Sequence, residues 1–407
     1  MLVIYEVMLI FMVGLEYRYY RSYITPFTII GSIYILVPLL LKAIGKQIHM
    51  YEISDFNLLC TLIYLLILWS SNLIWIFQQK KQKYYKEYNI NRYEIKIDMF
   101  EKIIFIFFLV CVIAFVSNAF HVVRVYGIAN TKNHTNGLTA HMGYMALMMA
   151  PYITYTGLTK KKIVYIGSVG ILGITLLVLQ NKLPIIILLL QCTYFILCVK
   201  GRVKGKGIIK KAVIIAVVVV LLFILLYSVR PWLMGENTSL KSALEHGIER
   251  CIHYFFSGFI SSNEYYQNPC GNKNGMRVAF GFFDTLFQAI SGNRNYIDPV
   301  ITKWVLIAPG SGTNVGGLFS ELVYQIGYIN AGIYVWLVGT MIYMFYNLTC
   351  KWQIFVNTTC YLIAVLSISF FCNFFSLFAT IEKLCYVFLL DVLIVYFKIF
   401  KVRIKIK

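Results

Sequence analysis

The chain has 407 residues, of which 59% are hydrophobic and only 13% are charged. This apolar content exceeds what the core of a soluble protein of this length needs, so composition excludes an ordinary soluble globular protein and favours a protein embedded in a lipid bilayer. The net charge of +20 would suggest a nucleic-acid partner in a soluble protein. Here the basic residues lie mostly in short segments between apolar runs, where they act as topology signals, and no nucleic-acid partner is expected.

Apolar runs recur along the whole chain. About 20 apolar residues in a helix cross a hydrocarbon core of roughly 30 Å, and a helix satisfies its own backbone in lipid. We predict eleven membrane helices, at Leu2–Leu15, Ile24–Leu41, Phe56–Phe77, Ile103–Val123, Leu138–Leu158, Ile163–Leu179, Leu183–Val199, Ala212–Val229, Gly327–Tyr346, Phe355–Phe378 and Leu384–Phe397. The first run lacks a basic flank and a small-residue cleavage site, so we interpret it as a retained helix and not as a signal peptide.

The basic residues predict the orientation of these helices. With the N-terminus outside and the C-terminus in the cytoplasm, the inner segments hold 24 lysines and arginines, and the short outer segments hold 6. Long loops hardly influence topology, so the seven basic residues between Val229 and Gly327 are left out of this comparison. We therefore expect an all-α polytopic membrane protein in three parts: helices one to eight in residues 1–229, a large extracytoplasmic loop in 230–326, and three helices with a basic cytoplasmic tail in 327–407.

The large loop is the one predicted soluble segment long enough to build a site. Its apolar stretches Cys251–Ile260, Val278–Ile290 and Ile297–Ala308 predict short helices at the membrane surface. Between them lie arginines, carboxylates and histidines, a mixture that suits acid–base and anion-binding chemistry. Arginine is the natural partner for a pyrophosphate, because its planar fork donates two parallel charge-assisted hydrogen bonds. Taken alone, each of these charges is more typical of a solvated loop residue or an ordinary ion pair than of a catalytic group.

Several kinds of site are not expected. No P-loop, GxGxxG or DxD pattern occurs, so cytoplasmic nucleotides and nucleotide sugars are not expected as substrates. His246 and His253 are seven residues apart, but no third ligand has matching spacing, and no metal site is expected. The ten cysteines show no CxxC spacing, and Cys251 and Cys270 in the large loop are compatible with a disulfide or with two free thiols.

The end of the large loop is rich in glycine. The sequence Ala308-Pro-Gly-Ser-Gly-Thr-Asn-Val-Gly-Gly317 leads into a helix that carries Glu321 in its first turn. Glycines allow a backbone to approach a ligand closely. Glu321 is therefore a candidate general base at the outer mouth of the helices. The alternative is that Glu321 only interacts favourably with the positive end of the helix dipole, and both interpretations stay open.

These segments resemble the Wzy-type O-antigen and capsule polymerases of bacteria. Three features carry the resemblance: the aromatic, glycine-containing stretch Tyr254–Ile260 with Glu264-Tyr265-Tyr266; Gly312-Thr313-Asn314-Val315 with the helix that follows as far as Tyr328; and Gln180–Pro184 before an apolar run. Lys182 stands where the family often has an arginine. The layout of many helices with one large late outer loop covers nearly the whole chain.

The resemblance implies transfer of a growing glycan from undecaprenyl pyrophosphate to an incoming lipid-linked repeat unit, outside the bacterial plasma (inner) membrane. It implies a GT-C-like helical fold, a metal-independent glycosyltransferase without cofactors, and, as further partners, a chain-length regulator and a flippase. The catalytic candidates are Glu321, Glu264 and His253. The candidates for binding the pyrophosphate and glycan are Arg230, Arg250, Arg277, Arg294, Lys182, Arg124 and Asn314.

Two alternative functions remain. An O-antigen ligase uses the same lipid-linked donor and passes the glycan to lipid A. A polysaccharide flippase or another transporter would also be basic and polytopic, but transporters typically carry ionisable groups at mid-bilayer in paired repeats. In this chain Glu6 and Asp391 are the only acids within the predicted membrane runs. For both we expect pairing with a neighbouring helix.

Overall fold

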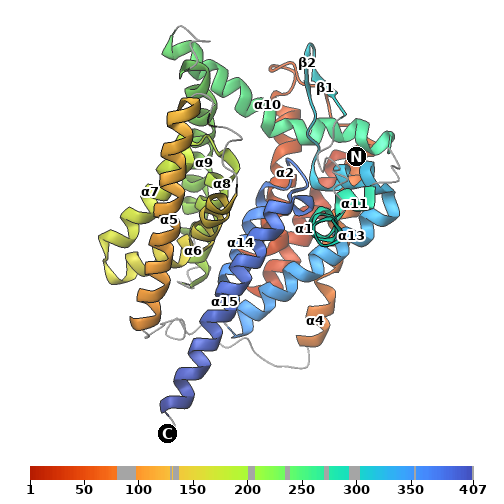
Figure 1. Ribbon diagram of the computed structural model, residues 1–407. Coiled ribbons are helices and arrows are strands. Elements are labelled where there is room, and N and C mark those ends of the chain that lie inside the picture. The colour runs from red at the N-terminus through yellow and green to blue at the C-terminus, as the bar shows by residue number, and fades with distance from the viewer. Residues whose placement is uncertain are drawn as a thin grey trace. The chain divides into compact units, whose positions relative to one another are not determined.

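The computed structural model describes residues 1–79, 98–128, 131, 137–199, 207–233, 239–269, 275–292, 303–352 and 354–405. Within these ranges the secondary structure is helical except for one two-stranded hairpin. The chain divides into two compact units, whose elements are labelled in Figure 1. Unit 1 comprises Met1–Tyr85, His253–Asn347 and Val365–Glu382, and unit 2 comprises Lys86–Ile252, Leu348–Ala364 and Lys383–Lys407.

Among the described residues, five helical stretches are long and apolar enough to cross a membrane. They are Pro26–Ile44, Asp55–Ile76, Phe100–Tyr126, Lys182–Val199 and Leu318–Trp352. Shorter apolar helices cover Ile163–Val178, Val217–Val229 and Val356–Ile368. The structure thus agrees with an all-α membrane protein. The number of eleven spans, the orientation and the GT-C-like fold stay predictions.

Unit 1 begins with α1 (Leu2–Tyr20), α2 (Pro26–Ile44), α3 (Asp55–Ser70) and α4 (Leu73–Gln79). Side chains just before two of these helices set where they begin. The Thr25 hydroxyl accepts a hydrogen bond from the Thr28 amide (3.1 Å), and Pro26 occupies the first helical position of α2. The Ser54 hydroxyl accepts from the Asn57 amide (3.1 Å) at the start of α3. Such caps satisfy amide groups that have no partner inside the helix.

A buried carboxylate ties the helices of unit 1 together. Glu16, in α1, accepts hydrogen bonds from the Thr25 hydroxyl and from the Thr28 amide (2.9 Å) at the start of α2. It also accepts from the hydroxyl of Tyr343 and, at 3.4 Å, from the side-chain amide of Asn72. A charge buried among apolar helices is tolerated only when its lone pairs are satisfied. Glu16 therefore holds α1 and α2 in place.

The predicted outer loop is more regular than expected. It contains all of α10 (Leu240–Gln267), then α11 (Gly275–Ala279) and α12 (Gly281–Ser291), and the strands β1 (Val305–Ala308) and β2 (Ser311–Thr313). The strands are antiparallel, with Val305 opposite Thr313, and Gly310 in the turn has φ 72°. The prediction of a short helix over Ile297–Ala308 is wrong for Val305–Ala308. Pro309 and Gly310 form a turn that lets the flanking residues pair.

The helix α13 (Leu318–Trp352) is interrupted at Gly327, which has φ 77° and ψ 170°. Glycine adopts this positive-φ backbone conformation at little energetic cost. A short first segment, Leu318–Ile326, therefore precedes the long apolar segment. The predicted membrane run also began at Gly327, so the sequence placed this boundary correctly.

The predicted helix Phe355–Phe378 is wrong in its second half. α14 ends at Ile368 (Val356–Ile368), and only a short 3₁₀ turn, η3 (Phe374–Ser376), follows before α15 (Phe378–Lys405). Between them, the Ser369 carbonyl accepts from the Leu318 amide at 2.8 Å, and the Asn373 amide donates to Glu321 at 2.6 Å. Hydrogen bonds to α13 thus replace the helical ones, although most residues of the run are apolar.

Unit 2 contains α5 (Asp98–Tyr126), α6 (Leu138–Lys160), α7 (Ile163–Val178), α8 (Lys182–Val199) and α9 (Gly207–Leu233), with the first half of α10 and most of α14 and α15. Gly143 lets α6 approach α5, because a Cβ atom there would lie 2.5 Å from the Phe115 ring. Glu101 of α5 is buried and forms ion pairs with Lys160 and, at 3.0 Å, with Lys162. These contacts join α5 to α6 and to the turn before α7.

The two acids of the predicted membrane runs differ. In unit 2, Asp391 of α15 accepts from the Asn357 side chain and from the amide and hydroxyl of Thr358, each at 2.8 Å. The expected pairing of Asp391 with a neighbouring helix is confirmed. In unit 1, Glu6 is buried, and its carboxylate has no hydrogen-bond partner among the described residues. The expected pairing of Glu6 is therefore not found there.

Candidate functional site

Three backbone segments of unit 1 meet at Gly258, in α10. A Cβ atom at this position would lie 2.4 Å from the Phe370 carbonyl oxygen and 3.3 Å from the Gly317 amide nitrogen. The Gly317 amide also donates to the Gly258 carbonyl (3.3 Å). Glycine is required here because no larger residue allows the backbones to come so close. The start of α13 is thereby fixed against α10 and the segment after α14.

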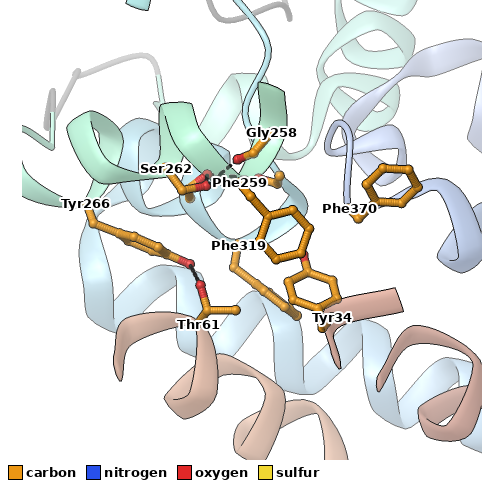
Figure 2. A pocket seen from close by; sticks show the side chains of 10 residues that line it. Tyr34, Thr61, Gly258, Phe259, Ser262, Tyr266, Phe319 and Phe370 are labelled. Carbon is orange, nitrogen blue, oxygen red and sulfur yellow. Dashed lines mark hydrogen bonds between the residues drawn. The ribbon is translucent and has the colours of Figure 1, made fainter. Parts of the chain in front are cut away.

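Beside this crossing lies a small pocket, shown in Figure 2. Tyr34 and Thr61 come from α2 and α3, Ser262 and Tyr266 from α10, and Phe370 from the segment after α14. The Thr61 and Tyr266 hydroxyls are 3.3 Å apart, and the Ser262 hydroxyl donates to the Gly258 carbonyl at 2.5 Å. The pocket has room for about one water molecule. It is too small for a sugar.

Glu321 is a buried carboxylate whose two oxygens are both bound. One accepts from the Gly316 amide (3.0 Å), and the other accepts from the Asn373 amide (2.6 Å) and faces the Cys372 thiol (3.5 Å). The side chain is 4% exposed. Glu321 thus links the end of the hairpin to the segment after α14. A hydroxyl group of a substrate has no open path to such a carboxylate in this conformation.

Glu264 lies in a different environment, although it is only a few residues along α10 from the crossing. Its carboxylate is 2.6 Å from the Lys303 ammonium and accepts from the Asn268 side chain (2.9 Å). The Glu264 side chain is 39% exposed and that of Lys303 30%. This half-exposed ion pair places an acceptor of protons and a cation side by side, where a substrate can reach both.

Tyr265 contacts residues that surround both carboxylates. Its hydroxyl donates to the Lys303 carbonyl (3.0 Å), and its ring lies 5.1 Å from that of Tyr324, between centroids. A Cβ atom on Gly316 would approach the Tyr265 ring to 2.5 Å. Burial raises the pKa of the Tyr265 phenol well above its usual range, so the group stays neutral and acts as a donor. Tyr265 is thus linked to Glu264 through Lys303 and to Glu321 through Gly316.

His253 is not part of this group. It lies eleven residues before Glu264 in α10, which separates the two by about 16 Å along the helix. The His253 ring is buried, and its Nδ1 is 3.2 Å from the Ser311 hydroxyl at the start of β2. His253 therefore anchors the hairpin near its turn, and the three predicted catalytic residues do not share one site.

The other predicted site residues of unit 1 are Arg277, Asn314 and Arg294. The Arg277 guanidinium binds Asp284 through two hydrogen bonds, of 2.6 and 3.1 Å, and this contact holds the pKa of Asp284 below its usual range. The side chain of Arg277 is 36% exposed. Asn314 is exposed in the segment after β2, and Arg294 lies outside the described residues.

The remaining predicted binding residues belong to unit 2. Arg124 at the end of α5 and Arg250 in the first half of α10 are exposed. The Lys182 ammonium, at the start of α8, lies over the ring of Tyr227 in α9. Arg230 lies in α9, and its side chain is outside the described part of the structure.

Lys303 and Tyr265, which form the group around Glu264, were not predicted as site residues, and Tyr265 entered only as part of the Glu264-Tyr265-Tyr266 motif. Lys303 is 39 residues from its partner Glu264, so no local spacing pointed to the pair. Among the described residues, no three histidine, cysteine, aspartate or glutamate side chains gather where they could hold a metal ion. Cys251 is a free thiol, and its possible partner Cys270 lies outside the described residues.

A comparison of the chain with protein-family models, with curated proteins and with solved structures finds no match. What the protein does is therefore argued from the geometry above.

Proposed function

We propose that the chain lengthens lipid-linked glycans on the outer face of the bacterial plasma membrane. In this proposal a growing oligosaccharide leaves its undecaprenyl pyrophosphate carrier and joins a sugar hydroxyl of an incoming repeat unit. The large segment between α9 and α13 faces outward, and the N-terminus lies outside. No nucleotide sugar is consumed, because the pyrophosphate-linked donor already carries a good leaving group.

The observation that carries the proposal is the half-exposed pair of Glu264 and Lys303. In a chain with so few charges, an accessible carboxylate and ammonium 2.6 Å apart are the groups that such a transfer needs. The ring of Tyr324 is partly exposed and lies 6.0 Å from the Lys303 ammonium, whereas the Tyr265 ring that packs against it is fully buried. Aromatic faces beside polar groups offer a surface on which a sugar ring can lie.

The chemistry assigns one role to each charge. The Glu264 carboxylate takes the proton from the acceptor hydroxyl as its oxygen forms a bond to the donor's anomeric carbon. The bond between that carbon and the pyrophosphate oxygen breaks, and the pyrophosphate leaves with the electron pair. The Lys303 ammonium stabilises the negative charge that grows on the leaving oxygen, so it acts most strongly in the transition state.

Glu321 has a positioning role in this proposal and not the role of a general base. Its carboxylate satisfies two backbone amides and is covered by the segments that supply them. By holding Gly316, it keeps the Tyr265 ring and the start of α13 in register. His253 is likewise assigned to holding the hairpin through Ser311. The arginines Arg230, Arg250, Arg277 and Arg294 remain candidates for further contacts to the pyrophosphate.

The proposal is tested with purified protein in lipid vesicles that contain undecaprenyl-pyrophosphate-linked repeat units. We expect glycans of two or more repeats on the carrier, with and without a metal chelator. A second arm adds lipid A. Transfer of single repeats to lipid A without lengthening on the carrier would identify a ligase and overturn the proposal, and so would the absence of any new glycan product.

A further inference from the structure

The helix α12 presents an apolar stripe to its surroundings. Phe283, Leu286, Phe287 and Ile290 follow the i, i+3, i+4, i+7 spacing of one helix face, and they are 63%, 46%, 70% and 79% exposed. Four large apolar side chains in a row form a patch of the size that soluble monomers rarely leave uncovered. A partner that excludes water is therefore expected at this face.

The sides of α12 away from the stripe are already occupied. Phe282 stacks on Phe378 at the start of α15, with ring centres 5.3 Å apart, and Phe280 just before the helix packs on Tyr334 of α13 at 5.3 Å. Asp284 is bound by Arg277 and by the Gln288 side chain. The helix is thus anchored to the membrane helices on one side and polar on another, and its stripe lies on the remaining side.

The position of Tyr334 indicates what covers the stripe. Tyr334 is seven residues beyond the break at Gly327, about 10 Å into the long segment of α13. The same turns of α13 expose Ile329, Ile333 and Leu337, which are 80%, 55% and 50% accessible. On a helix that spans a membrane, such exposed aliphatic residues face lipid. The start of α12 therefore packs on the same turns of α13 whose exposed aliphatic residues face lipid.

From this we infer that α12 is an interfacial helix, whose Phe283, Leu286, Phe287 and Ile290 side chains insert into the acyl-chain region of the membrane lipid beside α13. An amphipathic helix in this position buries its apolar face at the boundary between headgroups and acyl chains and keeps its charges at headgroup level. Arg277 and Asp284 supply those charges. The inference depends on membrane insertion alone and not on glycosyl transfer, so either can fail without the other.

The test places a photoreactive benzophenone side chain at one position at a time in the full-length protein. The protein is reconstituted in vesicles of phosphatidylethanolamine and phosphatidylglycerol. Position 287 lies in the stripe, and position 285 is a matched control, because Thr285 is also exposed but lies about 200° around the same helix. Position 290 repeats the test on the stripe. All three sites are exposed, so folding is expected to be retained and is checked by the unfolding midpoint.

We expect roughly tenfold more lipid adduct at positions 287 and 290 than at 285, because only the stripe enters the acyl region. Equal adduct yields at the three positions would overturn the inference. So would cross-links from 287 to a second copy of the chain or to another part of the same chain in place of lipid. A catalytically inactive but folded protein would still give the lipid adducts.

Discussion

Two glutamates of unit 1 near Tyr265 have opposite surroundings. Glu321 is 4% exposed and binds two backbone amides, whereas the Glu264 side chain is 39% exposed and pairs with a lysine. The first arrangement fixes segments of the chain to each other, and the second leaves a reactive group accessible. The comparison shows that a structural carboxylate is distinguished by its hydrogen bonds to the backbone and its burial, and one that can act on a substrate by its exposure. Position near a glycine-rich loop does not distinguish the two.

The largest expected effect is the loss of stability when Glu321 is replaced. Replacing Glu321 by alanine leaves the amides of Gly316 and Asn373 buried without an acceptor. At about 1–3 kcal/mol for each amide, the free energy of unfolding should fall by about 2–6 kcal/mol. Denaturant unfolding in detergent measures this loss. Glu321→Gln keeps one acceptor oxygen and should lose less. Wild-type stability in the alanine variant would contradict the structural role.

A second, smaller loss of stability is expected at Gly258, where three backbone segments meet. The change Gly258→Ala forces a methyl group to within 2.4 Å of the Phe370 carbonyl, so the backbones must move apart at a cost of about 1–3 kcal/mol. The control is Gly14→Ala in α1, where nothing lies within 4 Å of the new atom. That variant should match or exceed wild-type stability in thermal unfolding. Equal behaviour of the two variants would show that the backbones do not meet at Gly258.

Asp391 of unit 2 extends the comparison to a second buried carboxylate. Asp391→Ala removes the acceptor of the Thr358 amide, with an expected loss of about 1–3 kcal/mol in unfolding free energy. The loss should be smaller than at Glu321, because the Thr358 hydroxyl and the Asn357 side chain can turn toward other acceptors while backbone amides cannot. A larger loss than for Glu321→Ala would reverse this ranking.

The smallest effect concerns the ion pair of Arg277 and Asp284. The pKa of Asp284 is lowered in the folded protein, so its stabilising contribution is present above the unfolded pKa of about 3.9 and is lost as the pH falls through the folded value. The difference in unfolding midpoint between wild type and Asp284→Asn should therefore shrink between pH 7 and pH 3. It should be small throughout, because the pair is partly exposed and screened. A difference that grows in acid would have the wrong sign.

The sequence predicts the helices well because each is encoded locally. Ten of the eleven predicted runs lie on helices over nearly their whole length, the second half of Phe355–Phe378 does not, and the boundary at Gly327 coincides with a break in α13. Two features were missed. The hairpin depends on a Pro309–Gly310 turn directly after Ile297–Ala308, a run that was interpreted as apolar helix. The end of α14 at Ile368 depends on bonds from Ser369 and Asn373 to α13, which no local pattern reveals.

The candidate site was only partly predictable, for the same reason. Glu264 and Glu321 were identified from residue type and place, but their difference arises from partners that lie far along the chain. Lys303 is 39 residues from Glu264, and Asn373 is 52 residues from Glu321. His253 was grouped with them from its residue type, because the helix predicted over Cys251–Ile260 ended before Glu264. In a continuous α10, three helical turns separate it from Glu264.

The most direct test of the central claim is the rate of glycan lengthening by the Glu264→Gln variant. The account predicts a rate at least about a hundredfold below wild type, the usual contribution of a general base, with an unchanged unfolding midpoint. Glu249→Gln, an exposed glutamate elsewhere in α10, should keep the wild-type rate. A Glu264→Gln protein that lengthens glycans as fast as wild type would contradict the account.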